Sequence, residues 1–452
     1  MKIKFLGATE TVTGSKYLIE SNGFKVLVDC GLFQGLKELR LRNWDKFPMD
    51  PTQINAVLLT HAHIDHSGYL PVLMKQGFNG PIYCTSGTKD LCHVLLPDAA
   101  KLQEEEAGYA NRKGFSKHHP ALPLFTVEDS ERVLKQFKPI EFDREIDLTE
   151  DLKLKFTPSG HILGSAFATL KSQKITIVFS GDLGRPIDLI MKPPTFIENA
   201  DYLLIESTYG DRTHPVENPV DQLAEVINRT VKRNGVVIIP AFSVGRSQSF
   251  LYAIHLLKSQ KIIADTPVYL NSPMSINAMG IYCDHRAEHR LSPEQCHEMC
   301  NVAKYVRTTE DSKALNNKKG PMIIISASGM MTGGRVLHHL KAFAPDPRNT
   351  ILLAGYQAAG TRGDSLFKGA KTLKMHGEQV PVNAEVASIN GFSAHADQNE
   401  ILGWLKHFSN APKMTFITHG EPLSAKGLET KIQADLKWNT KIPKYLEEVE
   451  LQ

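Results

Sequence analysis

The sequence predicts an α/β protein in which a β-rich unit is interrupted by a unit of parallel strands and helices. Up to about residue 205, short β-prone runs end abruptly in polar loops that contain Gly, His or Asp, as in antiparallel meanders. Beyond Glu206, strands alternate with helical patterns, which is typical of a parallel sheet covered by helices. From about residue 373 the β-type pattern resumes, as though the first unit were interrupted and then completed.

Length and composition describe an ordinary folded protein. The chain has 452 residues, which favours two or three compact units. Hydrophobic residues make up 42% and charged residues 22%, which argues against disorder, collagen-like repeats and a coiled coil. The formal net charge of +3 is too small to indicate a nucleic-acid-binding protein from bulk charge alone. Any site for a polyanion must therefore be local.

The sequence lacks the features of an exported or membrane-spanning chain. Its first residues have no long apolar stretch followed by a small-residue cleavage site. The longest apolar runs are far shorter than the roughly 20 residues needed to cross a bilayer. The six cysteines are too widely spread for the disulfide framework of a small secreted domain. We therefore expect a cytoplasmic location, no membrane contact and reduced thiols.

The N-terminal part predicts a three-stranded meander followed by a buried strand and a helix. The expected elements are strands at residues 2–6, 15–20, 24–30 and 54–60 and a helix at 68–76. Asn22-Gly23 is the clearest hairpin turn, and Gly77 is placed to stop the helix. A second meander is expected from strands at residues 145–155, 166–171 and 174–179.

Beyond Glu206, two strand-loop-helix units predict parallel pairing, because a helix in the connection lets the next strand run in the same direction. The units are residues 235–240 with 247–258, and 322–326 with 334–343. Ser292 begins a further helix as its N-cap, with Pro and Gln at favoured positions of a capping box. Strands at residues 385–389 and 414–418 are expected in the completing segment.

The strongest chemical signal is the segment HAHIDH at residues 61–66, directly after an expected strand. Alternate residues of an extended chain point to the same side, so His61 and His63 can converge on one cation. The turn that follows can present Asp65 and His66 to another cation. This one segment therefore has the ligands to begin two metal sites.

Further ligand-type residues follow other expected strands. They are His161, Asp182 and His419, each beside small residues that leave room for a metal and a substrate. A single histidine after a strand is more often a hydrogen-bonded loop residue than a ligand, and for His161 alone that interpretation is favoured. Because ligand-type residues follow several expected strands, metal binding is favoured for the set as a whole.

The ligand set fits two cations. We assign His61, His63 and His161 to the first ion, Asp65, His66 and His419 to the second, and Asp182 as the bridge between them. Oxygen and imidazole ligands without cysteine suit Zn²⁺, so two Zn²⁺ per chain are expected, with Mn²⁺ or Fe as alternatives. Such a pair, roughly 3.5 to 4 Å apart, can hold a hydroxide at neutral pH and polarise an ester or phosphodiester oxygen.

With Asp29, His161 and Asp182, the motif at residues 61–66 resembles the metallo-β-lactamase superfamily. The resemblance covers residues 1 to 205 and implies an αββα sandwich. It also implies that Asp29 orients the metal-binding loop through hydrogen bonds instead of ligating the metal. A strand-end aspartate that caps a turn is the alternative interpretation, and its role is nearly the same.

Three further motifs resemble, in order, motifs A, B and C of the β-CASP nucleases: Glu206 in IESTYG, His395 in FSAHAD and His419 in THGE. Those enzymes carry an α/β domain inserted into the metallo-β-lactamase fold. The insertion matches the changes of pattern near residues 206 and 373. The implied domains are a metallo-β-lactamase domain at residues 1–207 and 373–452 and a β-CASP domain at residues 208–372.

The inserted segment contains three strand-end loops with Gly, hydroxyl or amide groups and Arg, at residues 241–248, 326–335 and 355–363. Gly lets backbone N–H groups approach an anion, and Arg supplies a forked donor for phosphate. The candidate substrate-binding residues are Ser243, Arg246, Ser328, Gly329, Arg335, Thr361 and Arg362. Each loop alone is more often an ordinary α/β connection; the three together favour a polynucleotide backbone.

The resemblance points to RNA, because a histidine at motif C accompanies the RNA-acting members of the family and His419 stands there. The whole chain resembles bacterial relatives of the cleavage and polyadenylation specificity factor nuclease. We expect a dizinc ribonuclease for single-stranded RNA, acting in RNA processing or decay as an endonuclease, with 5′ exonuclease action as a second mode. A homodimer is left open.

The expected mechanism is attack by the bridging hydroxide on the scissile phosphorus, with the ions neutralising the phosphate oxygens. The catalytic set is Asp65, Asp182, Glu206 and His395. His395 would stabilise the phosphate or protonate the leaving oxygen, and Glu206 would orient it. For Glu206 the alternative is a strand-end carboxylate paired with a surface cation.

Two rival functions are weighed against the ribonuclease. One is a small-molecule metallo-hydrolase of the glyoxalase II or lactamase type, which would need no insert with Arg-bearing loops. The other is a non-catalytic RNA-binding subunit, against which the full set of ligands counts. Cys296 and Cys300, four residues apart on an expected helix, have no further ligands in the sequence nearby, which favours packing over a metal site.

Overall fold

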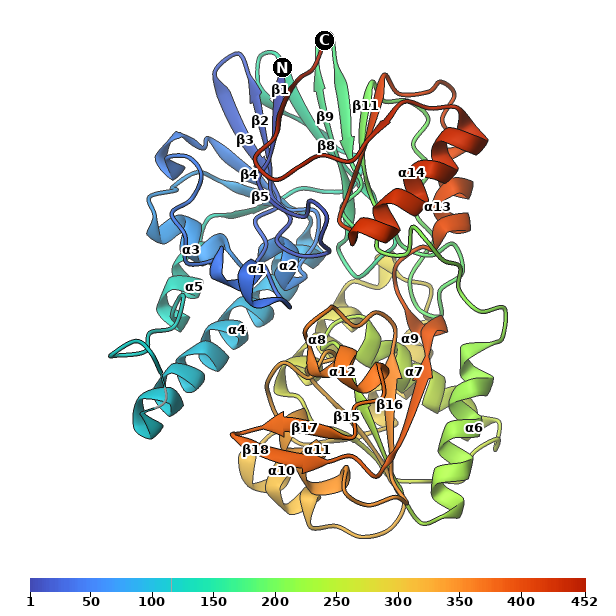
Figure 1. The fold of residues 1–452 in the computed structure, drawn as a ribbon. Coiled ribbons are helices and arrows are strands. Elements are labelled where there is room, and N and C mark those ends of the chain that lie inside the picture. Colours follow the sequence, from blue (N-terminus) through green and yellow to red (C-terminus); the bar gives the residue numbers. More distant parts are fainter. Residues whose placement is uncertain (115) are drawn as a thin grey trace. The chain divides into compact units, whose positions relative to one another are not determined.

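The computed structural model describes residues 1–114 and 116–452 (Figure 1). The chain forms two compact units. The first unit comprises Met1–Thr213 and His395–Gln452, and the second unit is His214–Ala394. Among the described residues, no helix combines the length and apolar character that crossing a membrane requires.

One sheet of the first unit begins with the expected N-terminal meander. Its strand order is β22-β1-β2-β3-β4-β5-β6. The strands are β1 (Lys2–Phe5), β2 (Tyr17–Ser21), β3 (Phe24–Val28), β4 (Ala56–Leu58), β5 (Ile82–Cys84), β6 (Phe137–Pro139) and β22 (Glu448–Glu450). β1, β2 and β3 pair antiparallel, as predicted. Asn22 and Gly23 both have positive φ, 49° and 81°, which a tight hairpin turn requires.

The other sheet of the first unit has the order β21-β20-β11-β10-β9-β8-β7. Its strands are β7 (Glu145–Thr149), β8 (Leu152–Pro158), β9 (Ala166–Ser172), β10 (Thr176–Phe179), β11 (Tyr202–Glu206), β20 (Met414–Thr418) and β21 (Thr440–Lys441). β7 to β10 form the second predicted meander. The expectation of one strand over residues 145–155 was wrong, because the chain turns at Glu150-Asp151 and pairs Thr149 with Leu152.

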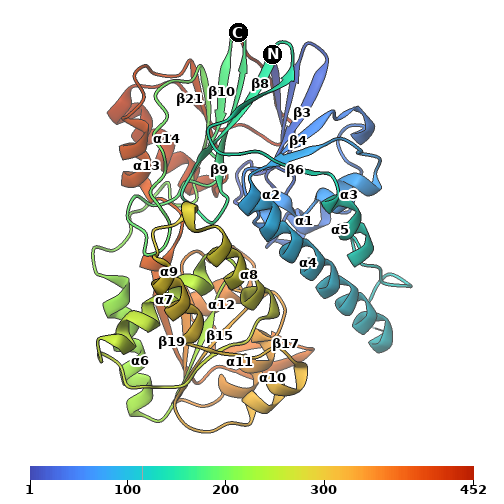
Figure 2. The same cartoon turned by 180° about the vertical axis from the view of Figure 1, so that it is seen from behind.

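Helices cover the outer faces of both sheets of the first unit (Figures 1 and 2). These are α1 (Lys37–Leu41), α2 (Ile64–Ser67), α3 (Leu70–Lys75), α4 (Ser86–Lys113), α5 (Val127–Leu134), α13 (Gln398–Leu405) and α14 (Pro422–Leu436), with the 3₁₀ turn η1 (Pro51–Gln53). Phe5, Phe156 and Phe179 belong to the apolar core between the sheets. A second core, with Trp404 and Leu428, lies between the second sheet and α13 and α14. This is the predicted αββα sandwich.

Helix α4 contradicts the expectation that the chain is β-dominated up to residue 205. It runs for 28 residues from the N-cap Thr85 to Gly114, whose φ of 64° suits a helix end. Its first half buries Leu91 and Leu95, whereas its second half is mostly exposed, and Pro97 interrupts its ladder of hydrogen bonds. The apolar residues therefore form no continuous stripe that periodicity could detect.

The second unit is a six-stranded sheet in which every neighbouring pair is parallel, as predicted. The order is β14-β13-β15-β12-β16-β19. The strands are β12 (Val236–Pro240), β13 (Val268–Leu270), β14 (Lys304–Tyr305), β15 (Met322–Ser326), β16 (Thr350–Ala354) and β19 (Glu385–Ile389), beside the hairpin β17 (Thr372–Met375) and β18 (Glu378–Pro381).

Most helices of the second unit lie between these strands in the chain, as the alternating pattern requires. The helices are α6 (Pro219–Lys232), α7 (Arg246–Ser259), α8 (Pro273–Asp284), α9 (Pro293–Asn301), α10 (Thr309–Asn316), α11 (Val336–Phe343) and α12 (Arg362–Phe367), with the 3₁₀ turns η2 (Arg286–Glu288) and η3 (Asn390–Phe392). Helix α6 precedes β12, and η3 follows β19. Ser292 caps α9 in the predicted capping box with Gln295.

Strand β19 lies in a different place from the one expected. Residues 385–389 were expected in the completing part of the first unit, but all five pair in parallel with β16 and form the edge of the second unit's sheet. The chain returns to the first unit only at His395. A five-residue β-prone run has no feature that states which sheet it joins, because that depends on its partner strand.

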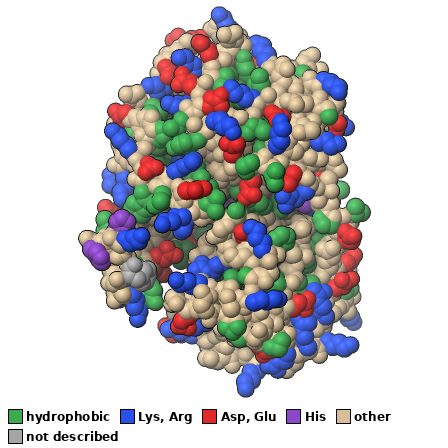
Figure 3. All heavy atoms as spheres, viewed as in Figure 1, with side chains coloured by type: hydrophobic (Ala, Val, Ile, Leu, Met, Phe, Trp, Pro, Cys, Tyr) green, Lys and Arg blue, Asp and Glu red, His purple; other side chains and the backbone are tan. Residues whose placement is uncertain are grey.

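On the face shown in Figure 3, surface charge of one sign does not form a large patch. Lys and Arg side chains are interspersed with Asp and Glu side chains over the face shown in Figure 3. This mixture agrees with the formal net charge of +3. A site for a polyanion has to be argued from local groups.

We predict that Phe156→Ala strongly destabilises the first unit. Phe156 lies on β8, is fully buried and belongs to the core between the sheets. Removing a buried phenyl ring costs about 3–5 kcal/mol of unfolding free energy, because a cavity remains. Ile187→Ala, at a position that is 78% exposed, is the matched control and should change that free energy by less than about 0.5 kcal/mol. Urea unfolding followed by fluorescence measures both; equal effects would contradict the core assignment.

Candidate metal centre

The segment at residues 61–66 occupies the turn between β4 and α2, where the first unit's backbone is packed very closely. His63 precedes α2, and Asp65 and His66 lie within it. Gly31 touches this turn: a Cβ atom there would lie 1.5 Å from the carbonyl oxygen of Asp65. Cys30 N–H donates to the carbonyl oxygen of His66 at 2.7 Å. The glycine thus lets two loops meet and fixes where the ligands point.

Four side-chain atoms form a first cluster of metal-ligand type. Nε2 of His61 and Nε2 of His161 each lie 3.2 Å from Nδ1 of His63. The same two Nε2 atoms each lie 3.3 Å from Oδ2 of Asp182. A tetrahedral Zn²⁺ about 2.0–2.1 Å from four donors would separate those donors by about 3.3–3.4 Å. The spacing of these four atoms therefore fits a tetrahedral cation.

A second cluster lies next to the first and shares Asp182. Nε2 of His66 lies 3.1 Å from Nε2 of His419 and 3.2 Å from Oδ1 of Asp182. Oδ2 of Asp65 lies 3.5 Å from Nε2 of His419. Asp182 thus presents one oxygen to each cluster. The structure brings together all seven side chains that the sequence analysis assigned as ligands.

Three buried imidazoles are held neutral. Burial lowers the pKa of His61 to about 3 and that of His63 to about 4, and it lowers the pKa of His161 well below its ordinary value. Each neutral imidazole has one unprotonated nitrogen that can bind a cation. The chemistry of this donor set therefore fits a divalent metal ion.

At Asp182 and His66, neighbouring charges outweigh the effect of burial on the pKa. Burial by itself would raise the pKa of Asp182, but the neighbouring imidazoles, His419 and His66 foremost, hold it well below its ordinary value. Burial would also lower the pKa of His66, but the carboxylates of Asp182 and Asp29 raise it well above its ordinary value. The carboxylate that joins the clusters is therefore ionised.

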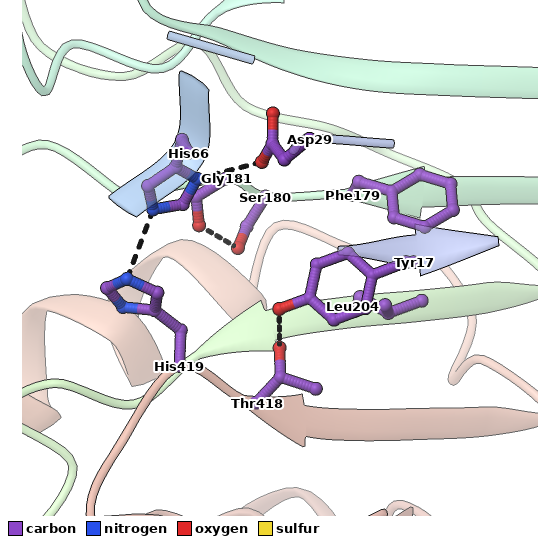
Figure 4. Close-up of a pocket in the computed structure, with 9 residues that line it drawn as sticks. All are labelled: Tyr17, Asp29, His66, Phe179, Ser180, Gly181, Leu204, Thr418 and His419. Atoms are coloured by element: carbon purple, nitrogen blue, oxygen red, sulfur yellow. Dashed lines mark hydrogen bonds and ion pairs between the residues drawn. The ribbon is translucent and has the colours of Figure 1, made fainter. Parts of the chain in front are cut away.

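Asp29 holds the ligand turn through three hydrogen bonds. It accepts from the backbone N–H and the hydroxyl of Thr60 at 2.8 and 2.9 Å, and Nδ1 of His66 lies 2.8 Å from its Oδ2. Figure 4 shows His66 between Asp29 and His419. With Nδ1 engaged by Asp29, the other nitrogen of His66 faces the second cluster.

Three hydroxyl side chains beside the ligands were missed by the sequence analysis. Thr60 Oγ1 lies 3.1 Å from Nδ1 of His61, Thr208 Oγ1 lies 3.2 Å from Nδ1 of His419, and Ser15 Oγ lies 3.4 Å from Nε2 of His66. The sequence contained a partial signal. Thr60 directly precedes the histidine motif, and Thr208 stands two residues after Glu206, but Ser15 has no motif near the ligands.

His395 and Glu206 form a pair at the edge of the two clusters. Nδ1 of His395 lies 3.0 Å from Oε1 of Glu206 and 3.9 Å from Oδ2 of Asp182. Glu206 is buried at the end of β11 and also accepts the backbone N–H of Leu183 at 2.8 Å. The side chain of His395 remains 15% exposed. The partner of Glu206 is thus an imidazole beside the clusters, not a surface cation.

In the second unit, the three predicted loops leave the same edge of the sheet. β12 pairs in parallel with both β15 and β16, so their carboxyl ends lie together. The guanidinium of Arg246 donates to Ala354, that of Arg335 to Val306 and Arg307, and that of Arg362 to Met331, Thr332 and Lys374, in each case to a carbonyl oxygen. These bonds brace the loops, and phosphate binding by the arginines stays a prediction.

The remaining loop residues make local contacts. Ser243 Oγ lies 3.4 Å from Ser272 Oγ, and Ser328 Oγ lies 3.1 Å from Thr332 Oγ1. Thr361 caps α12 by accepting the N–H of Asp364. Gly329 approaches Phe242 so closely that a Cβ atom would lie 3.0 Å from its ring. In this region Gln357 adds a buried amide whose Nε2 and Oε1 have no hydrogen-bond partner among the described residues.

We predict that Asp29→Asn weakens metal binding by about 10- to 100-fold, because an amide cannot accept all three hydrogen bonds that hold the ligand turn. Competition with a fluorescent chelator measures the affinity. Asp50→Asn is the control, because Asp50 caps the exposed 3₁₀ turn η1 and does not belong to the ligand clusters. Equal affinity of wild type and Asp29→Asn would refute the proposed role of these bonds.

Comparison with family models divides the chain in the same order as its motifs. A metallo-β-lactamase superfamily domain matches residues 18–205. A Beta-Casp domain matches residues 247–366. A Zn-dependent metallo-hydrolase RNA specificity domain matches residues 379–443.

Several characterised proteins resemble the chain along most of its length. Ribonuclease TTHA0252 of Thermus thermophilus is 38% identical over 93% of this chain and 93% of its own. The RNase J-like protein of Methanocaldococcus jannaschii is 30% identical over 98% and 97%. The transcription termination factor FttA of Methanosarcina mazei is 30% identical over 100% of this chain and 72% of its own.

A solved structure supports the fold. The crystal structure of a protein of unknown function from Enterococcus faecalis V583 aligns over 100% of this chain and 99% of its own, with a TM-score of 0.54 and 14% identity. Family matches over nearly the whole chain, full-length relatives and the predicted sandwich with its inserted parallel sheet agree. The chain belongs to the β-CASP family of the metallo-β-lactamase superfamily.

Proposed function

We propose that this protein is a metal-dependent ribonuclease that hydrolyses phosphodiester bonds of single-stranded RNA. The observation that carries the proposal is the pair of ligand clusters joined by Asp182, with His395 and Glu206 beside them. The family supports the choice of substrate, because two of the full-length relatives are named ribonucleases and one matched domain is an RNA specificity domain. RNA processing or decay is the corresponding cellular role.

Two Zn²⁺ ions are the proposed cofactors, with Mn²⁺ as the alternative. The first would be held by His61, His63, His161 and Asp182, and the second by Asp65, His66, His419 and Asp182. When bound, such a pair lowers the pKa of a water molecule and neutralises charge on the phosphate oxygens. The tetrahedral spacing and the absence of thiol ligands support zinc.

Asp65 and Asp182 would contribute charge to the reaction. Asp182 is buried and ionised, and it lies between both clusters, so it can keep two cations close together without their full mutual repulsion. The side chain of Asp65 remains 22% exposed, and the neighbouring His419 and His66 hold its pKa below its ordinary value against the effect of burial. An ionised carboxylate at the exposed side can accept a proton from water.

His395 is proposed to hold the scissile phosphate or to protonate the leaving oxygen. Its Nδ1 faces the carboxylate of Glu206 at 3.0 Å, which favours the tautomer with the proton on Nδ1 or the doubly protonated imidazolium. Either form is oriented by Glu206, and the second carries the proton that a leaving group needs. Glu206 therefore acts through His395 as a positioning residue.

The loops of the second unit are proposed to bind the RNA backbone. Backbone N–H groups at the carboxyl ends of β12, β15 and β16, with the hydroxyls of Ser243 and Ser328, would donate to phosphate, and Thr361 would hold its loop by donating to the carbonyl oxygen of Ala358. The buried amide of Gln357 adds a donor and an acceptor that lack protein partners among the described residues.

The decisive experiment compares linear and circular RNA. We predict that the metal-loaded protein cleaves both, because the clusters require no free 5′ end; cleavage of the linear RNA alone would show an exonuclease. The same preparation should leave a thioester of the glyoxalase II type and a β-lactam unchanged. Hydrolysis of either small molecule without RNA cleavage would refute the ribonuclease proposal, and RNA binding without any cleavage would support the non-catalytic alternative.

We predict that His395→Ala keeps its metal and loses about 10²- to 10⁴-fold in RNA cleavage, the usual contribution of a positioned acid or base. Metal content per chain and the rate at saturating RNA measure the two effects. His407→Ala is the matched control, because His407 stacks on exposed Phe196, outside the ligand clusters. Loss of metal from His395→Ala would show that His395 is a ligand instead.

A further inference from the structure

Three thiols meet between two helices of the second unit. Cys283 stands in the last turn of α8, while Cys296 and Cys300 stand one turn apart on α9. The Sγ atoms of Cys283 and Cys300 lie 3.7 Å apart, in contact but unbonded. The sequence contained only the pair on α9, because Cys283 is separated from it by the turn that joins the helices. The third thiol changes what this cluster can do.

Partial exposure distinguishes two of these thiols from the other cysteines. Cys283 and Cys300 are only partly buried, whereas Cys296 is 1% exposed. The three remaining cysteines are fully buried in the first unit: Cys30, Cys84 and Cys92. Cys283 and Cys300 are therefore the pair in which sulfur contact and access for a small reagent coincide.

A metal site fits this cluster poorly. The imidazole of His289 lies 3.8 Å from the sulfur of Cys296, but its Nε2 is 2.9 Å from the carbonyl oxygen of Tyr282 and its Nδ1 accepts the N–H of Leu291. Both ring nitrogens are thus engaged. In the part of the chain that the structure describes, the groups of ligand atoms close enough to share an ion do not include these thiols.

We propose that Cys283 and Cys300 are a redox-active pair that forms a reversible disulfide within the chain. The oxidant is a low-molecular-weight disulfide. A thiolate of Cys283 attacks one sulfur of that molecule, which breaks its S–S bond, forms a mixed disulfide and releases one small thiolate. Cys300 then gives its proton to that thiolate through water and attacks Sγ of Cys283, which releases the second small thiolate; water protonates it to the thiol. Two protein thiols are oxidised and one small disulfide is reduced.

The geometry assigns the order of the two attacks. Cys283 faces both thiols of α9, so the sulfur that is modified first can be reached by a partner without unfolding. Burial raises the pKa of Cys300 to about 12 and that of Cys296 to about 11, so both stay protonated at neutral pH and are poor first nucleophiles. The bond would join the last turn of α8 to the last turn of α9 and close the chain between them.

The test uses the full chain with its metal bound and oxidised glutathione as the probe. We expect the number of free thiols, titrated after denaturation, to fall from six to four and to return to six after a reducing agent. Digestion with trypsin, which cuts after Arg286 and Arg290, and with a glutamyl protease, which cuts after Glu298, separates all three cysteines. The mass of the linked peptides then identifies the pair directly.

Three variants complete the test. Cys283→Ser should keep all five of its thiols, and Cys300→Ser should lose one, because the mixed disulfide of Cys283 with glutathione cannot be resolved by Cys300. Cys296→Ser, the matched control one turn away on α9, should still lose two. The proposal is overturned if the wild type keeps six thiols, if Cys283→Ser loses two, or if the linked peptides contain Cys296. It is also overturned if Cys283→Ser holds one metal ion fewer than the wild type, which would make the cluster a metal site.

Discussion

The ionised carboxylate of Asp182 is the group on which the metal centre depends. It is buried, and its two oxygens lie 3.2 to 3.3 Å from imidazole nitrogens of both clusters. An isolated carboxylate in this position would be strongly disfavoured, so the surrounding imidazoles and a cation must compensate for its lost hydration. The parallel pairing of β10, β11 and β20 brings the strand ends that carry Asp182, Glu206 and His419 to one edge of the sheet.

Most residues of the candidate metal centre could be predicted from the sequence, because they stand at or just after the ends of strands that the sequence pattern predicts. Because side chains alternate along an extended chain, the motif at residues 61–66 was predicted to present ligands to two cations. Three further ligands were predicted because each is a ligand-type residue that follows a β-prone run: His161, Asp182 and His419. The resemblance to the β-CASP nucleases added Glu206 and His395. The two meanders and the parallel sheet of the second unit followed from the sequence pattern, whereas the sandwich followed from the resemblance to the metallo-β-lactamase superfamily, and the structure confirms all three.

The features that could not be predicted depend on contacts between residues that are distant in the chain. Strand β19 could have joined either unit, and only its pairing with β16 decides. Helix α4 lacks a continuous apolar stripe, and the contact of Cys283 with Cys300 arises from the packing of α8 on α9. The braces made by Arg246, Arg335 and Arg362 were also hidden, because their acceptors are backbone carbonyls that any residue provides.

The place of β20 in its sheet has a consequence for synthesis in the cell. β20 pairs with β11 although more than two hundred residues separate them, and His419 follows it directly. The ribosome therefore makes every ligand of the first cluster long before it makes His395 and His419. A nascent chain that stalls within the second unit therefore lacks two of the side chains that lie around Asp182 in the finished protein.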